Sequence, residues 1–182
     1  PVTMKTPDIE RRGAAGGLRA SGRTLTGYAA VFGTETRMGS FTERIAPGAF
    51  SKSLASGRDI LALLDHRADV LLGRTASGTL KLTEDAKGLR FDLELPDTQA
   101  GRDLVALAER GDLGGMSFGF IAEDEAWTGN TRELRQVDLR EVSVIQAFPA
   151  YQQTEISLRN KPAELSFWDS GDVRGMWLDT CR

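Results

Sequence analysis

Around Ser117, large apolar residues alternate with small ones over residues 114–120. Such a pattern could present the serine as a nucleophile. If residues 114–120 are extended, successive side chains point to opposite faces of the strand. The large apolar residues of one face would then enter the core: Met116, Phe118 and Phe120. Gly115 and Gly119 flank Ser117 on the other face, where their missing side chains would leave room for a substrate backbone. The pattern predicts a nucleophilic serine in a trough, the alternative being a structural serine between glycines.

His66 is the only histidine in the chain and therefore the only imidazole that could serve as a base. A serine hydroxyl is a poor nucleophile until a base takes its proton, and an imidazole titrates near neutral pH. His66 ends the apolar run of residues 60–66, which predicts a strand with the histidine at its end. The alternative is a surface or capping histidine without a chemical role.

A third group should orient the imidazole, and the acidic candidates are Asp65, Asp69, Asp138 and Glu141. Asp65 adjoins His66 on the expected strand and therefore points to the opposite face. Glu141 opens an apolar, β-branched run in which a carboxylate is costly to bury unless it is paired or hydrogen-bonded. We therefore favour Glu141, the alternative being a solvent-exposed glutamate at the edge of the fold.

Strands are the main elements that would position these residues. Short runs rich in apolar and β-branched residues, separated by turn signals, favour an antiparallel meander or barrel. The expected strands are residues 24–32, 60–66, 70–75, 79–83, 89–95, 114–120, 134–145 and 154–158. Helical spacing over residues 97–110 predicts a helix that Asp97 or Thr98 caps and Gly111 ends. A shorter helix, begun by Pro47, is expected over residues 46–54.

The chain of 182 residues, 40% of them hydrophobic, suits one compact domain with modest tails. Residues 1–22 are polar and glycine-bearing, which predicts a flexible lead. Residues 33–44 are expected to form a long loop, either a functional lid or a disordered connection. Residues 160–182 carry two of the three tryptophans, which predicts either docking on another surface or a loose extension.

Composition excludes several classes of function. A net charge of -3 and a pI near 5.3 give no support for nucleic-acid binding, so we expect protein partners. The single cysteine, Cys181, excludes an internal disulfide, and one histidine removes most zinc-ligand sets, so no metal and no other cofactor is expected. No apolar run is long enough to cross a bilayer and no hydrophobic signal segment is present, which predicts a cytoplasmic protein with no membrane contact.

Several blocks of sequence occur in an order that is specific, although each block alone is weak. They are residues 27–32, 45–50, 64–66, 72–74, 115–120, 139–143 and 149–151. In these blocks the chain resembles the prohead (capsid maturation) proteases of tailed bacteriophages and gene transfer agents, the type associated with HK97-like capsids. The resemblance runs from about Gly22 to Arg159. It implies a protease domain at residues 23–159, preceded by the flexible lead and followed by the extension at 160–182.

This family is in turn similar to the herpesvirus assemblins. The likeness implies a mainly β fold, a distorted antiparallel β-barrel with a few flanking helices. Assemblins use a serine and two histidines, so the likeness implies a triad of Ser117 and His66 in which Glu141 replaces the second histidine.

The same likeness implies oxyanion donors in the loop that follows the strand of the third triad member. Proline has no N–H, so Pro149 leaves Ala150 or Tyr151 as the backbone donor. Arg140 or Arg74 could add positive charge.

The function that the resemblance implies is a serine endopeptidase of capsid maturation. It would cleave the N-terminal scaffold segment of the major capsid protein, and its own termini by autoproteolysis, inside the prohead in the host cytoplasm. Its partners would be the major capsid protein with its scaffold segment, and a second copy, because assemblin-like proteases gain activity as homodimers. The alternatives are a non-catalytic β-barrel scaffold or assembly factor, and a different serine hydrolase.

Overall fold

A computed structural model describes residues 8–15 and 18–147 of the chain. Its elements in chain order are β1 (Glu10–Ala15), β2 (Arg19–Ser21), β3 (Thr24–Val31), β4 (Thr36–Met38), β5 (Phe41–Ile45), α1 (Ser51–Ala55), β6 (Leu61–Leu64), β7 (Arg67–Arg74), β8 (Leu80–Glu84), β9 (Gly88–Glu94), α2 (Gln99–Arg110), β10 (Gly115–Thr128) and β11 (Thr131–Ile145). None of the helices in these residues is both long and apolar enough to cross a membrane.

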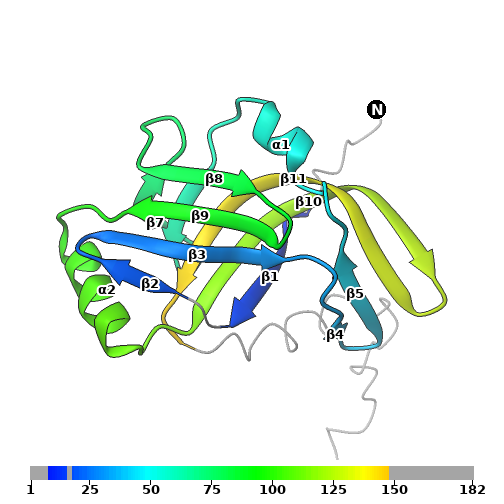
Figure 1. Cartoon of the computed structure of the whole chain (residues 1–182), viewed down its shortest axis with the longest axis horizontal. Helices are drawn as coiled ribbons and strands as arrows, with labels where there is room; N and C mark the ends of the chain where they lie inside the picture. The colour runs from blue at the N-terminus through cyan, green and yellow to red at the C-terminus, as the bar shows by residue number, and fades with distance from the viewer. Residues whose placement is uncertain (1–7, 16–17, 148–182) are drawn as a thin grey trace, which may run out of the picture.

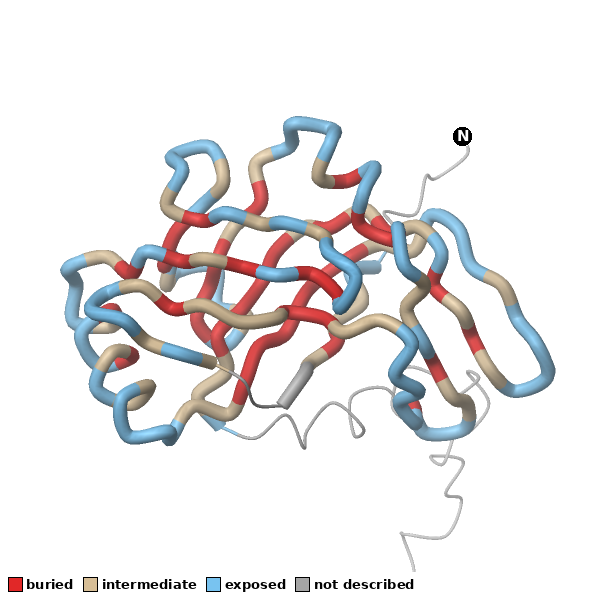
Figure 2. The backbone as a smooth tube through the Cα atoms, in the orientation of Figure 1, coloured by how far each residue is buried: buried red, intermediate tan, exposed pale blue. Residues whose placement is uncertain are grey.

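The strands form two sheets. A seven-stranded sheet has the order β1-β10-β11-β5-β4, and β6 joins it by pairing with β11 on one side and β7 on the other. A four-stranded sheet has the order β2-β3-β9-β8 and crosses in front of β10 and β11 in Figure 1. Buried residues run along β9 of one sheet and along β10 and β11 of the other where the two sheets cross in the view of Figure 2. The hydrophobic core therefore lies between the sheets.

The predicted fold class is confirmed in part. The described residues are mainly β with two helices, but no closed barrel is found among them, and the expected barrel is wrong on this point. The seven-stranded sheet is mixed, because β5 and β6 both pair with β11 in parallel while β10 pairs with it antiparallel. The reason is the length of β11, whose first half pairs with β5 and whose second half pairs with β6.

Both predicted helices are confirmed. The side chain of Thr98 caps α2 by accepting a hydrogen bond from the backbone N–H of Gly101 at 3.3 Å. Gly111 ends the helix in the left-handed conformation with φ 75°, which a residue without Cβ adopts at little cost. The short helix α1 is present, but it begins at Ser51 after Phe50 and is not begun by Pro47 as expected.

Two stretches that were expected to lack regular structure contain strands. Residues 33–44 hold β4 and most of β5, which pair as a short antiparallel hairpin rather than a long loop. The lead at residues 1–22 holds β1 and β2, of which β1 pairs with the serine-bearing β10. These strands are short and polar, so their pairing depends on neighbours that local sequence does not reveal. The strand expected at residues 154–158 lies outside the described residues.

Candidate active site

Strand β10 presents Ser117 on the face opposite to the core. Met116, Phe118 and Phe120 are 1%, 2% and 0% exposed and enter the core as predicted, but Ser117 is itself fully buried, so the expected open trough around it is wrong. The rings of Phe118 and Phe120 stack at 5.3 Å, and Phe50 meets Phe118 edge to face at 5.5 Å. These contacts fix the backbone of β10 and so fix the position of Ser117.

The pairing of β10 with β11 brings a second serine and a carboxylate to the face of Ser117. Ser117 lies opposite Ser143, and Gly119 lies opposite Glu141. Paired residues of neighbouring strands share a face, so Glu141 is the diagonal neighbour of Ser117. Ser117 and Glu141 therefore lie on one surface of the seven-stranded sheet.

His66 reaches this surface from the turn that joins β6 to β7. Leu64 pairs with Arg67, so Asp65 and His66 form a two-residue hairpin loop. Both have positive φ, 48° and 60°, as the central residues of a type I′ turn require. The histidine therefore stands in a turn and not on the strand that the sequence predicted. The parallel pairing of β6 with β11 brings this turn beside the strand of Glu141.

His66 and Glu141 form a close pair. Nδ1 of His66 lies 2.7 Å from Oε1 of Glu141. An ionised carboxylate can only accept, so Nδ1 donates and a neutral ring keeps Nε2 unprotonated. This is the tautomer that a general base needs.

Glu141 is held in its charged form although it is only 7% exposed. Burial disfavours the carboxylate, but the hydrogen bond and charge of His66, helped by Arg11, outweigh it and hold the pKa of Glu141 below its ordinary value of 4.5. Nε of Arg11 lies 3.4 Å from the same oxygen that His66 binds. The alternative of a solvent-exposed glutamate is therefore wrong.

Gly119 provides the space in which the Glu141 side chain lies. A Cβ built on Gly119 would stand 2.8 Å from both Cγ and Oε1 of Glu141, closer than real Cβ contacts allow. The sequence predicted that this glycine leaves room for a substrate backbone. In the structure the carboxylate of Glu141 occupies that room.

Ser117 and Ser143 are both fully buried, but their hydroxyls differ. The hydroxyl of Ser117 donates to the backbone carbonyl of Arg12 on β1 at 2.7 Å. Oγ of Ser143 has no hydrogen-bond partner within the described part of the chain. Ser143 is a second buried hydroxyl on the candidate surface that sequence reasoning missed, because no glycine marks its strand.

The other acidic candidates bind elsewhere. Asp65 accepts a hydrogen bond from the backbone N–H of Gln146 at 3.0 Å, which closes the turn and occupies its carboxylate. Asp69 pairs with Arg67 at an exposed position. Asp138 lies 2.6 Å from Arg140. Among the four acidic candidates, Glu141 is the one that the structure brings to His66.

None of the residues predicted to stabilise the oxyanion is seen at the candidate site within the described part of the chain. Ala150 and Tyr151 lie outside the described residues. Arg140 is paired with Asp138, and Arg74 is bound by Asp59, with Nε 2.6 Å from the carboxylate. The guanidinium that reaches the candidate site is that of Arg11, on a strand where the sequence predicted a flexible lead.

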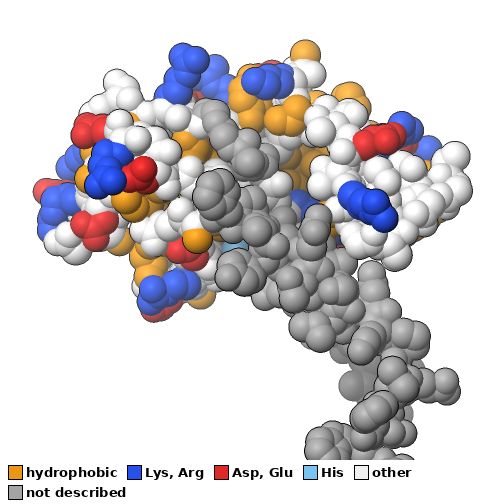
Figure 3. All heavy atoms as spheres, turned by 90° about the horizontal axis from the view of Figure 1, so that it is seen from below, with side chains coloured by type: hydrophobic (Ala, Val, Ile, Leu, Met, Phe, Trp, Pro, Cys, Tyr) orange, Lys and Arg blue, Asp and Glu red, His pale blue; other side chains and the backbone are white. Residues whose placement is uncertain are grey.

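The arrangement places an imidazole bound to a carboxylate and a serine on the face of that carboxylate, which are the groups that an activated serine requires. The His66 side chain is 17% exposed, and Figure 3 shows histidine, in pale blue, at the surface of one face. Acidic and basic side chains are interspersed on the described part of that face. No group of three or more His, Cys, Asp or Glu side chains that could hold a metal is found in residues 8–15 and 18–147.

Comparison with models of protein families gives a match over much of the chain. The model of a family described as caudovirus prohead serine protease matches residues 9–166. No curated protein and no solved structure gives a significant match. The matched span begins just before β1 and contains Ser117, His66 and Glu141.

Proposed function

The chain belongs to the caudovirus prohead serine proteases, and from this premise we propose that Ser117, His66 and Glu141 form its catalytic triad. As a prohead serine protease it is a hydrolase that acts inside the assembling capsid and associates with capsid proteins. The observation that carries the proposal is the 2.7 Å contact between His66 and Glu141 on the face that presents Ser117.

In the proposed mechanism Oγ of Ser117 attacks the carbonyl carbon of the scissile peptide. Nε2 of His66 takes the hydroxyl proton and passes it to the leaving amine as the C–N bond breaks. Water then attacks the acyl ester, with His66 again as the base, and releases the new carboxyl end. Glu141 keeps the ring in the required tautomer and stabilises the imidazolium that forms at each attack.

Ser117 must change its hydrogen bond before it can attack. In the structure its proton is directed to the carbonyl of Arg12, whereas attack requires it to be directed to His66. In the proposed mechanism, rotation of the Ser117 side chain to another staggered position turns the hydroxyl from Arg12 toward His66. The arrangement therefore supports a resting state in which the Arg12 carbonyl of β1 accepts the hydrogen bond of the Ser117 hydroxyl.

The finer parts of the proposal follow the family. The substrate is the N-terminal scaffold segment of the major capsid protein, and the enzyme also trims its own termini. Ala150 or Tyr151 supplies the oxyanion donor, Gly115 contacts the substrate, and the active species is a homodimer. A non-catalytic scaffold is the alternative that the next experiment separates.

A fluorophosphonate probe tests whether the serine is activated. We expect the purified chain to be labelled at Ser117 and the His66→Ala variant to lose labelling, because only a serine with a base reacts readily. The probe is applied at several protein concentrations, since a dimer would label faster per chain as concentration rises. Equal labelling of the parent and His66→Ala at every concentration would overturn the proposed mechanism. No labelling at any concentration would favour the non-catalytic scaffold.

A further inference from the structure

Strand β1 lies where an extended peptide substrate would meet the serine. It is the end strand of the seven-stranded sheet and pairs antiparallel with β10. In this register Gly13 lies opposite Ser117 and Arg12 opposite Phe118. The Ser117 hydroxyl donates to the carbonyl oxygen of Arg12, so it contacts the peptide group that joins Arg12 to Gly13. Addition of a strand to a sheet edge is a common way to bind an extended peptide.

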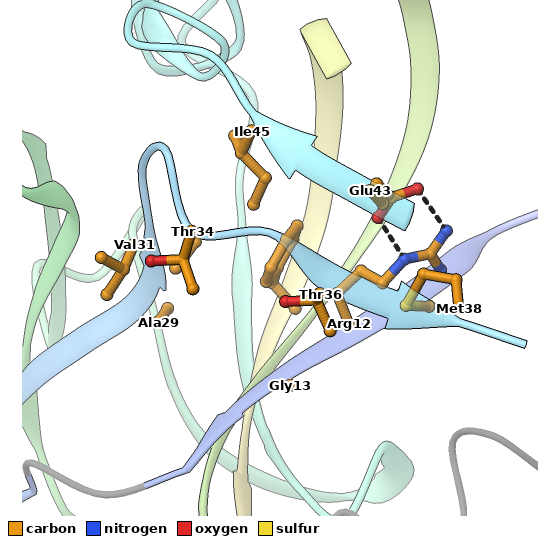
Figure 4. A pocket seen from close by; sticks show the side chains of 11 residues that line it. Arg12, Gly13, Ala29, Val31, Thr34, Thr36, Met38, Glu43 and Ile45 are labelled. Atoms are coloured by element: carbon orange, nitrogen blue, oxygen red, sulfur yellow. Dashed lines mark hydrogen bonds and ion pairs between the residues drawn. The ribbon is translucent and has the colours of Figure 1, made fainter. Parts of the chain in front are cut away.

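The side chain of Arg12 lies on the face of β1 that is opposite to Ser117, where it binds the carboxylate of Glu43. Nε of Arg12 lies 2.5 Å from Oε1 of Glu43, and Nη2 lies 2.9 Å from Oε2, a bidentate pair that Figure 4 shows. Glu43, on β5, is 3% exposed and Arg12 is 9% exposed. The guanidinium also lies 5.4 Å from the ring centre of Phe120. Arg12, whose carbonyl accepts the Ser117 hydrogen bond, is thus bound through its side chain by the buried carboxylate of Glu43.

The charges around Glu43 fit a cationic side chain that arrives with the peptide. Arg132 lies 3.1 Å from Glu43 and also binds Glu125. Without β1, this cluster therefore has two carboxylates and one guanidinium. They leave one negative charge, which the arginine of β1 meets. Glu10 of β1 binds Arg12 and Arg132 in turn, at 2.7 Å and 2.6 Å.

A cavity of about 310 Å³ adjoins the Arg12 side chain. Its walls are largely apolar and include Ala29, Met38, Ile45 and Phe118, while Arg12 and Glu43 line its polar side (Figure 4). Arg12 lines this cavity while Glu43 holds its guanidinium, so space remains beside the bound arginine side chain.

We propose that β1 occupies the position of the substrate strand, and that Glu43 selects an arginine or lysine at the residue whose carbonyl Ser117 attacks. This inference rests on the proposed function and names its substrate class. Cleavage breaks the bond between the basic residue and the next residue, as β1 presents it between Arg12 and Gly13. The amine leaves with the proton from His66, and water releases a peptide that ends in the basic residue. A substrate must displace β1 to bind.

Peptide binding to the full chain tests this assignment. The protein carries Arg12→Ala, which weakens the hold of β1, and the probe is a fluorescein-labelled peptide with the sequence of residues 8–15. A second peptide has citrulline, the uncharged isostere of arginine, at the position of Arg12. We expect fluorescence anisotropy to show that the arginine peptide binds at least about tenfold more tightly, the ratio that corresponds to about 1.4 kcal/mol. Competition from the chain's own β1 is the same for both peptides and cancels in the ratio.

Two further variants test whether the preference for the arginine peptide depends on Glu43. Adding Glu43→Gln should remove the preference for arginine, because the amide keeps the shape of Glu43 but loses its charge. Adding Arg19→Ala instead, at an exposed position on β2, should leave the preference intact. Equal affinity for the two peptides, no binding of either, or a preference that survives Glu43→Gln would overturn the inference. Binding does not require an activated serine, so fluorophosphonate labelling of the same samples reports separately on the proposed function.

Discussion

Glu141 is the residue on which the geometry of the candidate site depends most. It is buried, and one of its oxygens is shared by His66 at 2.7 Å and Arg11 at 3.4 Å. Gly119 opposite it has no side chain, which lets the carboxylate lie across β10. Each of these relations gives a prediction about a single substitution.

Replacing Glu141 with Gln should lower the rate of capsid-protein cleavage by up to about 10⁴-fold, the loss that an equivalent change causes in a serine protease triad. The amide keeps the shape but can present an N–H to the ring, which favours the wrong tautomer. Because Glu141 is 7% exposed, little water is available to replace its charge. Cleavage rates are compared with those of Asp65→Asn, Asp69→Asn and Asp138→Asn, which should stay near the parental rate. A parental rate for Glu141→Gln would remove the glutamate from the triad.

The lowered pKa of Glu141 predicts a dependence of stability on pH. A carboxyl group whose pKa is lower in the folded state stabilises the fold above its unfolded pKa, here 4.5, and loses that contribution as pH falls through the folded pKa. The unfolding free energy of the parent, relative to that of Glu141→Gln, should therefore fall as the pH is lowered below about 5. Urea unfolding of both proteins from pH 7 to pH 3 measures it. A difference that does not change with pH would contradict the assigned ionisation.

Gly119→Ala should impair catalysis more than stability. The new Cβ would stand 2.8 Å from Oε1 of Glu141, so the carboxylate must move and its bond to His66 must lengthen. The backbone of Gly119 is not in the left-handed region, so alanine itself is not strained there. We expect the cleavage rate to fall by at least about tenfold through misplacement of one catalytic group. Unchanged cleavage by a folded Gly119→Ala protein would mean that the observed position of Glu141 is unimportant.

At the scale of the elements, the hairpin of β6 and β7 positions the base at a cost in backbone strain. His66 has φ 60°, a left-handed conformation that costs a residue with a Cβ roughly 1–2 kcal/mol. His66→Gly and His66→Ala both remove the imidazole, so the difference between them isolates this strain. The glycine variant should be the more stable by about 1 kcal/mol in urea unfolding. Equal stabilities would show that the turn relaxes when the imidazole is lost.

The sequence predicted the elements whose signals are local. Alternation of Met116, Phe118 and Phe120 with small residues identifies β10, and Thr98 with Gly111 bounds α2. Strand β1 could not be predicted in this way, since Glu-Arg-Arg-Gly-Ala-Ala has neither β-branched nor aromatic residues and pairs only because β10 offers an edge.

A carboxylate in an apolar strand needs a partner, which is why the sequence favours Glu141, and in the structure His66 is that partner. The turn conformation of His66 and the parallel pairing of β6 with β11 had no local signal, because both depend on contacts distant in sequence. The arginines of β1 were missed for the same reason.

At the scale of the whole molecule, the hydrophobic core and the candidate catalytic residues lie on opposite faces of the seven-stranded sheet. The core lies between the sheets, on the Phe118 face of β10, while Ser117, Ser143 and Glu141 occupy the other face. Substitutions that remove a small polar group from the candidate face should therefore alter cleavage without emptying the core. The specificity pocket inferred around Glu43 lies on the Phe118 face, so the peptide in the position of β1 is contacted from both sides.

The most direct test of this account is cleavage of the cognate capsid protein by a matched pair of serine variants. Ser117 and Ser143 lie opposite each other, both fully buried, so Ser117→Ala and Ser143→Ala make the same chemical change on the same face. The account predicts no cleavage by Ser117→Ala and cleavage near the parental rate by Ser143→Ala, with both variants folded. Cleavage that persists in Ser117→Ala, or that is lost in Ser143→Ala alone, would contradict the assignment of Ser117 as the nucleophile.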